Sequence, residues 1–315
     1  MRLNVLDNPP PSRGNDIEDL RRELAGSVDG EVRFSAGDRA LYATDSSNYR
    51  QVPIGVVVPR SIDGVIATVA ACHRLGAAIV SRGAGTSLAG QCCNAAVVID
   101  HSKYLNRVLE IDPASQTARV EPGCVLDTLR HQAIQNHGLT FGPDPSTHAW
   151  CTVGGMIGNN SCGVHSVMAG RTSDCTIEMD VLTHDGVRMR VGPTNEAELE
   201  RRARIKGREG EIFGGLKALR DQNAELIRER YPRIPRRVSG YNLDELLPER
   251  DCNVARALVG SEGTCVVVLE ATMKLVKWPK KRAIAVLGYP DISSAGDHVP
   301  EVMRHQPIGL EGIDK

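Results

Sequence analysis

The sequence predicts an α+β fold, in which strands alternate with helices and also pair into hairpins. The first sign is a strand-helix-strand order: β-branched residues at 55–58, a helical apolar pattern from 61 to about 75, and an apolar run at 77–80. The second is a pair of hairpin patterns, one of them around the turn Asp185-Gly186, a strong short-range hairpin signal. Alternation combined with hairpins indicates an α+β fold and not a repeat array.

Capping residues and apolar spacing set the individual elements. Ser61 caps the helix that runs to about residue 75, and Gly76 ends it. The hairpins are predicted to pair 108–111 with 117–120, and 176–183 with 187–191. We also expect helices at 16–24 and 125–136, a strand at 96–99, and a charged, mostly helical segment with a solvated arginine-rich face at 195–237. Gly138 is the expected end of the second of these helices, and residues 31–49 have no clear period.

Length and composition narrow the class of protein. A chain of 315 residues with 41% hydrophobic content can bury a sizeable core and hold two domains. A net charge of −1 and an aromatic content of 3% argue against nucleic-acid binding, which favours a basic face or stacking rings. No run of 18 apolar residues occurs, so no transmembrane segment is expected.

The polar N-terminus and the cysteines add two further expectations. Residues 1–15 lack the apolar stretch of a signal peptide and are interpreted as a disordered lead-in. The nine cysteines are irregularly spaced without any Cys-x-x-Cys pair, so reduced thiols are expected and a metal or iron–sulfur site is not. We expect a cytoplasmic protein, with peripheral attachment to the inner membrane as the open alternative.

A glycine-rich loop at 81–91 is the first candidate site, because it directly follows an apolar strand. Glycines let backbone N–H groups turn toward an anion, which suits a phosphate or diphosphate. The residues involved are Arg82, Gly83, Ala84, Gly85, Thr86, Ser87 and Gly90.

Two familiar phosphate motifs do not fit this loop. The Rossmann fingerprint requires glycine where Leu88 stands, and a P-loop requires lysine where Gln91 stands. ATP or GTP chemistry is therefore disfavoured, and a diphosphate held by backbone donors remains. An ordinary glycine-rich turn after a strand is the alternative for this loop taken alone.

A second glycine-rich region spans residues 142–163. Its residues after Asp144 carry no fixed charge but many glycines, amides and hydroxyls. Such a surface suits close packing against a flat polar ring, and a flavin has the carbonyls and ring nitrogens to pair with it. A glycine-rich core turn with asparagine caps is the alternative.

The order of these motifs resembles a known family. Val-Pro-Arg-Ser at 58–61, the loop at 82–87, Asp-Pro-Ser at 144–146, Gly-Gly at 154–155 and Gly-Ser-Glu-Gly-Thr at 260–264 are similar to the FAD-binding domain of the vanillyl-alcohol-oxidase/p-cresol-methylhydroxylase type. Residues 158–172 resemble more narrowly the glycolate oxidase/D-lactate dehydrogenase branch. Within it, the likeness is to the large bacterial flavin and iron–sulfur proteins related to D-2-hydroxyglutarate dehydrogenase. The resemblance covers roughly 48–277.

The resemblance implies a two-subdomain FAD-binding domain of the p-cresol-methylhydroxylase type at 48–277. A lead-in with a helix would precede it at 1–47, and the start of a truncated substrate (cap) domain would follow at 278–315. The loop at 82–87 would bind the FAD diphosphate, and Glu262 and Gly263 would lie toward the nucleotide end. The flavin would be lined by Pro145, Ser146, Thr152, Gly155, Asn159, Asn160, Ser161, Cys162 and Gly163. Some relatives attach FAD through a histidine that corresponds to Thr86, so a non-covalent FAD is expected here.

The implied reaction is FAD-dependent oxidation of a D-2-hydroxy acid of the D-lactate, glycolate or D-2-hydroxyglutarate class. The substrate would lose a hydride from Cα and a proton from its hydroxyl group. His165 is the candidate catalytic base, with a hydrogen-bonded structural histidine as the alternative. Arg236 and Arg237 are candidates for the substrate carboxylate, with solvated surface charge as the alternative.

Two alternatives to a D-2-hydroxy acid dehydrogenase remain open from the sequence. The chain ends where the family's cap domain would open, and it lacks the cysteine-rich iron–sulfur part of longer relatives, so a truncated, non-catalytic FAD-binding fragment is the second hypothesis. An NADPH-using reductase of the cell-wall precursor type shares the fold but fits the narrower motif less well. The electron acceptor is not indicated by any residue.

Overall fold

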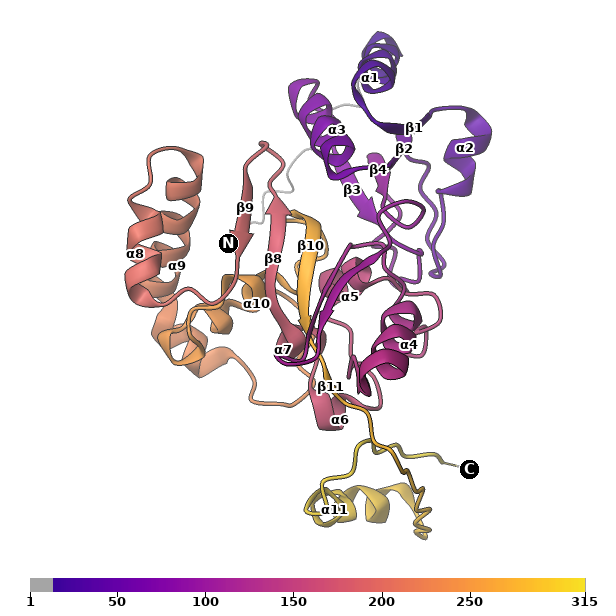
Figure 1. The fold of residues 1–315 in the computed structure, drawn as a ribbon, viewed down its shortest axis with the longest axis vertical. Helices are drawn as coiled ribbons and strands as arrows, with labels where there is room; N and C mark the ends of the chain where they lie inside the picture. The colour runs from indigo at the N-terminus through magenta and orange to yellow at the C-terminus, as the bar shows by residue number, and fades with distance from the viewer. Residues whose placement is uncertain (1–13, 315) are drawn as a thin grey trace. The chain divides into compact units, whose positions relative to one another are not determined.

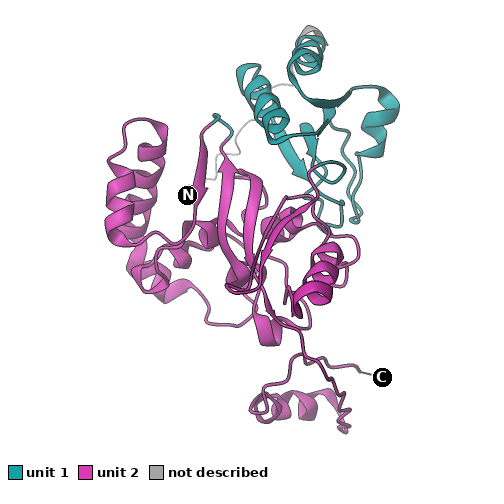
Figure 2. Ribbon diagram, viewed as in Figure 1, with its two compact units in different colours: residues 1–104, 184–186 teal, residues 105–183, 187–315 magenta. Residues whose placement is uncertain are grey.

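A computed structural model describes residues 14–314, with side chains from Ile17 onward (Figure 1). The chain forms two compact units, coloured separately in Figure 2. Unit 1 comprises residues 1–104 and 184–186, and unit 2 comprises residues 105–183 and 187–315. The expected disordered lead-in lies, except for its last two residues, outside the described part of the chain.

Unit 1 is built on a four-stranded sheet in the order β1-β2-β4-β3. Strands β2 (Gly55–Pro59), β4 (Val97–Asp100) and β3 (Ile79–Arg82) are parallel, and β1 (Gly30–Arg33) joins β2 in antiparallel register. Helices α1 (Gly14–Ser27) and α3 (Ile62–Arg74) cover one face. The core on that face contains Leu20, Leu24, Val57, Ala71, Cys72 and Val97.

Most of unit 1 follows the local sequence signals. The Ser61 hydroxyl accepts the Gly64 N–H at 3.2 Å and starts α3, while Gly76 adopts a φ of +64° directly after its end. Strand β2 is buried along its whole length, as a central parallel strand requires. Strand β1 and helix α2 (Ala36–Leu41) lie in the stretch where the sequence shows no periodic apolar pattern. Both elements are short and neither contains a buried residue, so neither produces such a pattern.

Unit 2 is built on an antiparallel five-stranded sheet in the order β5-β6-β10-β8-β9. The hairpin of β5 (Val108–Asp112) with β6 (Thr117–Val120) and that of β8 (Thr176–Leu182) with β9 (Arg188–Val191) confirm the two predicted hairpins. Strand β10 (Val267–Lys274) joins them in the middle of the sheet. A small second sheet pairs β7 (Leu139–Thr140) with β11 (Val276–Lys277).

One face of this sheet carries the main core of unit 2, which includes Val120, Phe141, Met179, Phe213 and Met273. Short elements pack around that core: α4 (Leu126–His137), α5 (Val153–Asn159), α6 (Ser166–Ala169), α7 (Thr172–Cys175), the 3₁₀ turns η1 (Leu243–Leu246) and η2 (Pro248–Arg250), and α10 (Val254–Leu258). Helix α4 ends at Gly138, whose φ is +65°, as predicted.

Helices α8 (Glu196–Ala203) and α9 (Arg208–Arg230) confirm the predicted helical segment and lie together beside β9 (Figure 1). Arg202 of α8 donates to the Arg190 carbonyl at 2.9 Å and so ties the pair to that strand. The prediction of a solvated arginine-rich face is wrong for Arg220. Its side chain is 4% exposed and pairs with Glu196 at 2.7 Å and with Asp221.

The last described segment makes few contacts. Residues 279–290 form no backbone hydrogen bond within the described chain, and the side chains of Ile284 and Val286 are 92% and 90% exposed. Helix α11 (Ile292–Met303) follows and has no buried residue. Within residues 14–314, no helix combines the length and apolar content that crossing a membrane requires.

Candidate functional site

The predicted diphosphate loop leaves the carboxyl end of β3 in unit 1. Arg82 anchors it from below: its guanidinium donates to the Thr44 carbonyl at 2.8 Å and lies 5.4 Å from the centre of the Tyr42 ring. Gly85 has a φ of +70°, and a Cβ there would lie 2.5 Å from an Arg82 nitrogen. The positive φ therefore favours glycine at this position, and a Cβ would displace the end of the Arg82 side chain.

The loop presents a row of unpaired donors. Within the described chain, none of the backbone N–H groups of residues 84–88 donates to an acceptor. This part of the loop is partly exposed, with Ser87 half-buried and Leu88 78% exposed. Consecutive backbone amides without an acceptor of their own can form an anion-binding concavity. The residues present therefore fit a diphosphate such as that of FAD.

The rest of the loop is fixed from the side. Asp45 accepts the backbone N–H of Cys92 at 3.3 Å and that of Ser47 at 2.9 Å. The Ser87 hydroxyl lies 3.2 Å from the Cys92 sulfur. These contacts fix the loop, which reduces the conformational cost of binding an anion.

Sequence reasoning missed one buried polar residue beside this loop, His101. It follows β4, and its backbone N–H donates to the Arg82 carbonyl at 3.1 Å. No local pattern marks a single histidine after an apolar strand, so only the sheet pairing reveals its place.

In unit 2 the predicted flavin-lining region contains a helix, α5, that the sequence did not predict. The Thr152 hydroxyl accepts the Gly155 N–H at 3.3 Å and caps α5. Val153, Met156 and Ile157 bury one side of the helix, and this helical spacing was the signal available in the sequence. The other side of the helix carries glycines, which project no side chain from that surface.

The turn after α5 is held by buried polar contacts. Asn160 has a φ of +50° and is fully buried, and its side-chain oxygen accepts the Ser173 N–H at 3.0 Å. The Ser161 carbonyl accepts both the hydroxyl and the backbone N–H of Thr172, at 2.7 and 3.0 Å. Asn159 donates from its side chain to the Ser161 hydroxyl at 2.9 Å, and Cys162 is half-buried. Asn160 and Thr172 thus shape the turn from inside.

A histidine–carboxylate pair lies next to this turn. Asp144 accepts the backbone N–H of His165 at 2.9 Å, and its second oxygen is hydrogen-bonded to His165 Nδ1. The side chains are 23% exposed for His165 and 12% for Asp144. Gly163 lies against the Asp144 carbonyl, and its own carbonyl accepts a hydrogen bond from exposed Arg236. Three segments far apart in sequence thus place an imidazole and a guanidinium around one turn.

Arg237, the other predicted carboxylate-binding residue, faces a different environment. It is buried, its guanidinium donates to Asp244 at 2.5 Å and to Asn242 at 3.0 Å, and it lies 4.7 Å from the centre of the Tyr231 ring. Its backbone carbonyl accepts a hydrogen bond from Arg171. These contacts give Arg237 a role in holding residues 231–244 together.

The remaining predicted residues lie around α5 and the loop before it. Glu262 adopts a φ of +52° and Gly263 one of +74°, and the Glu262 N–H donates to the Gly158 carbonyl at 3.0 Å. The Pro145 carbonyl accepts the His148 N–H at 2.9 Å, while Ser146 is exposed. Residues 262–263 therefore adjoin the C-terminal part of α5.

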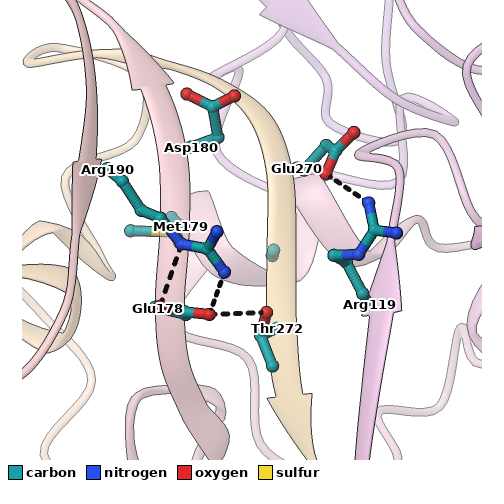
Figure 3. A pocket seen from close by; sticks show the side chains of 8 residues that line it. Arg119, Glu178, Met179, Asp180, Arg190, Glu270 and Thr272 are labelled. Carbon is teal, nitrogen blue, oxygen red and sulfur yellow. Dashed lines mark hydrogen bonds and ion pairs between the residues drawn. The ribbon is translucent and has the colours of Figure 1, made fainter. Parts of the chain in front are cut away.

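A charged hollow lies on the other face of the five-stranded sheet (Figure 3). Arg119 pairs with Glu270 at 2.9 Å, and Arg190 donates to Glu178 at 3.0 Å. Asp180 at its margin pairs with Arg188. Each of these charged side chains pairs with an oppositely charged side chain on a neighbouring strand. These ion pairs stabilise the sheet, and the hollow offers no unpaired cation to a phosphate.

A match to a known family supports FAD as the cofactor. Residues 53–192 match the family described as "FAD binding domain". This segment of the chain is thus similar to an FAD binding domain. The family resemblance inferred from the order of motifs, and the expectation of FAD, are therefore confirmed. The match includes the loop after β3 and the segment from Asp144 to His165.

Curated relatives of the chain include a dehydrogenase and an oxidase subunit named for 2-hydroxy acids. The chain is 32% identical over 289 residues to the D-2-hydroxyglutarate dehydrogenase of Pseudomonas putida, covering 90% of this chain and 29% of that protein. It is 36% identical over 311 residues to the glycolate oxidase subunit GlcD of Escherichia coli, covering 97% of this chain and 51% of that protein. The chain thus spans about half or less of the length of these relatives.

A solved structure confirms the fold class. An alkyldihydroxyacetonephosphate synthase aligns with a TM-score of 0.57 at 20% identity, covering 87% of this chain and 46% of that one. At this identity the likeness concerns the fold alone. It supports the predicted α+β, two-subdomain architecture of the FAD binding domain.

Proposed function

We propose that this chain is the FAD-binding part of an oxidoreductase that converts a D-2-hydroxy acid to the 2-oxo acid. The substrate class, D-lactate, glycolate or D-2-hydroxyglutarate, is suggested by relatives named for D-2-hydroxyglutarate and glycolate. The observation that carries the proposal is the cluster of Asp144, His165 and Arg236 around Gly163, in the region implied to line the flavin.

Each unit carries residues that we assign to the cofactor. The unpaired amides of residues 84–88 would bind the diphosphate. In unit 2, Thr152, Gly155, residues 159–163 and residues 262–263 would contact the flavin side, with Pro145 and Ser146 before them. Thr86 carries no nucleophilic imidazole, so we propose a non-covalent FAD.

The protein's own residues would supply proton transfer and substrate orientation. Because Asp144 binds His165 at Nδ1, it favours the tautomer in which Nε2 carries the lone pair. Nε2 would take the proton of the substrate hydroxyl, and Arg236 would hold the carboxylate through charge-assisted hydrogen bonds. Bound FAD supplies an acceptor for the Cα hydride, which with the hydroxyl proton accounts for both hydrogens lost on forming the 2-oxo acid.

The complete enzyme would need a substrate domain and an electron acceptor. We assign residues 48–277 to FAD binding and 278–315 to the start of the substrate domain, since the exposed apolar side chains of Ile284 and Val286 require a partner surface. The acceptor is proposed only as a small molecule or protein that reoxidises the flavin. A cytoplasmic location, with or without peripheral attachment to the inner membrane, belongs to the same proposal and is tested by cell fractionation.

The test uses the purified 315-residue chain loaded with FAD. We expect a yellow protein that releases FAD to the supernatant on acid precipitation, and dye reduction with at least one of D-2-hydroxyglutarate, D-lactate or glycolate. The L-enantiomers of the two chiral acids are the matched control. Flavin retained in the pellet would refute the non-covalent assignment.

A non-catalytic FAD-binding fragment is the second candidate function. It is favoured by the coverage of about half or less of the relatives and by the exposed segment at 279–290. This candidate predicts stoichiometric FAD binding without dye reduction by any of the three acids. Turnover by the isolated chain would exclude it, whereas a chain that does not bind FAD would contradict both candidates.

A further inference from the structure

His101 occupies the carboxyl edge of the parallel strands in unit 1. Strands β3 and β4 pair with Arg82 opposite Asp100, and the next residue, His101, donates its backbone N–H to the Arg82 carbonyl at 3.1 Å. The glycine loop begins directly after Arg82. The imidazole is therefore attached at the root of the loop that carries the unpaired amides.

The side chain of His101 is buried without a partner. The residue is 4% exposed, and neither Nδ1 nor Nε2 has a hydrogen-bond partner among residues 14–314. Its neighbour Asp100 is different, because that carboxylate accepts the Tyr42 hydroxyl at 2.7 Å and the Ser102 N–H at 2.8 Å. Buried polar atoms in native proteins are nearly always paired, so two orphaned nitrogens on one ring indicate a missing partner.

The protonation state narrows the chemistry of that partner. Burial lowers the pKa of His101 to about 4, so the ring is neutral near pH 7. A neutral imidazole has one N–H donor and one lone pair. A hydroxyl group can pair with either nitrogen, whereas an anion can use only the N–H. The ring is thus suited to a sugar hydroxyl more than to the diphosphate.

We propose that His101 binds a hydroxyl group of the sugar part of FAD, either the adenosine ribose or the ribityl chain. This rests on the FAD site of the proposed function and extends it to a residue that the sequence motifs do not mark. Ligands of parallel α/β sheets bind outside the carboxyl ends of the strands, and His101 directly follows the carboxyl end of β4.

The test compares wild-type chain with His101→Leu, in which an apolar side chain replaces the imidazole. We expect FAD to bind roughly tenfold or more weakly to the variant, measured by quenching of flavin fluorescence. The apo variant should melt at a higher temperature than apo wild type, because two unpaired buried nitrogens are removed. The rise in melting temperature on adding FAD should be smaller in the variant.

Two further variants separate this role from a general effect on unit 1. Thr68→Val removes another buried polar atom of the same unit, whose hydroxyl donates to the Gly64 carbonyl at 2.7 Å. It should lower the apo melting temperature and leave FAD affinity unchanged. His101→Asn keeps a donor and an acceptor near the Nδ1 position and should recover part of the FAD affinity that leucine loses.

The outcomes distinguish failure of the His101 contact from failure of the FAD site. If wild type binds FAD and His101→Leu binds it equally well, the proposal is overturned. If wild type binds no FAD, the cofactor site itself fails. Titration with AMP and with FMN identifies the hydroxyl: selective weakening of AMP binding points to the ribose, and of FMN binding to the ribityl chain. Weakening of neither, with FAD affinity also unchanged, refutes the contact.

Discussion

Replacing Gly163 by alanine tests whether the turn beside His165 is as close-packed as the structure indicates. A Cβ on residue 163 would lie 2.0 Å from the Asp144 carbonyl oxygen and 2.2 Å from its carbon, both of them backbone atoms. Real Cβ atoms do not approach within 3.0 Å, so one segment must move by about 1 Å. Overpacking of this kind costs about 1–3 kcal/mol.

The assay is thermal unfolding of the chain with and without FAD. For a domain of roughly 200 residues, each kcal/mol lowers the melting temperature by about 2–4 °C, so Gly163→Ala should melt about 2–12 °C below wild type. The displacement also separates Asp144 from His165, so turnover should fall more than FAD binding.

Gly158→Ala is the matched control. Its Cβ would meet only the Glu262 Cα at 3.8 Å, an ordinary contact, and it lies within α5. Alanine in a helix is favoured over glycine by about 0.5–1 kcal/mol, so this variant should be at least as stable as wild type. Equal melting temperatures for the two variants would refute the steric argument.

Three further predictions concern charge and thiol chemistry. Asp144→Asn should lower turnover at least roughly tenfold while FAD stays bound, because His165 loses the partner that sets its tautomer. Asp127→Asn, which alters a second His–Asp contact at 2.8 Å, should change turnover less than about twofold, and equal losses would contradict a special role for Asp144. Hydrogen bonds from its neighbours lower the pKa of Glu31 from 4.5 to about 2. Its carboxylate therefore stabilises the native state above pH 4.5, and this contribution is lost as the pH falls toward 2. Glu31→Gln should flatten that part of the pH dependence in urea unfolding, and an unchanged curve would exclude the contribution. Exposed Cys265 should react rapidly with a thiol reagent, and Cys265→Ser should remove one rapid equivalent. Burial raises the pKa of Cys72 to about 12, so its reaction should await unfolding, and rapid modification in native protein would contradict its burial.

Local signals predicted most of the regular elements. Ser61 and Gly76 marked both ends of α3, and the Asp185-Gly186 turn marked a hairpin whose Gly186 has a φ of +88°. These signals act within a few residues, so the sequence contains all that is needed to interpret them. Helix α5 was missed because its glycines obscured the apolar spacing of Val153, Met156 and Ile157.

The candidate site was predictable only in part. The glycine loop and the region at 142–163 were found from composition and motif order, and the family match supports FAD there. The pairing of Asp144 with His165, the approach of Arg236 to Gly163 and the burial of Arg237 depend on tertiary packing across many intervening residues. His101 had no motif at all, because its significance lies in unpaired nitrogens that only three-dimensional packing reveals.

The segment before α11 has a practical consequence for anyone handling the isolated chain. Residues 279–290 form no backbone hydrogen bond with any described residue. Two side chains within this segment, those of Ile284 and Val286, are nearly fully exposed. A segment with unpaired backbone groups and exposed apolar side chains can pair with the same segment of another chain. We therefore expect self-association that rises with protein concentration and originates outside the FAD site. Dilute storage, or a charged residue at Ile284, should keep preparations monodisperse without altering how they take up cofactor.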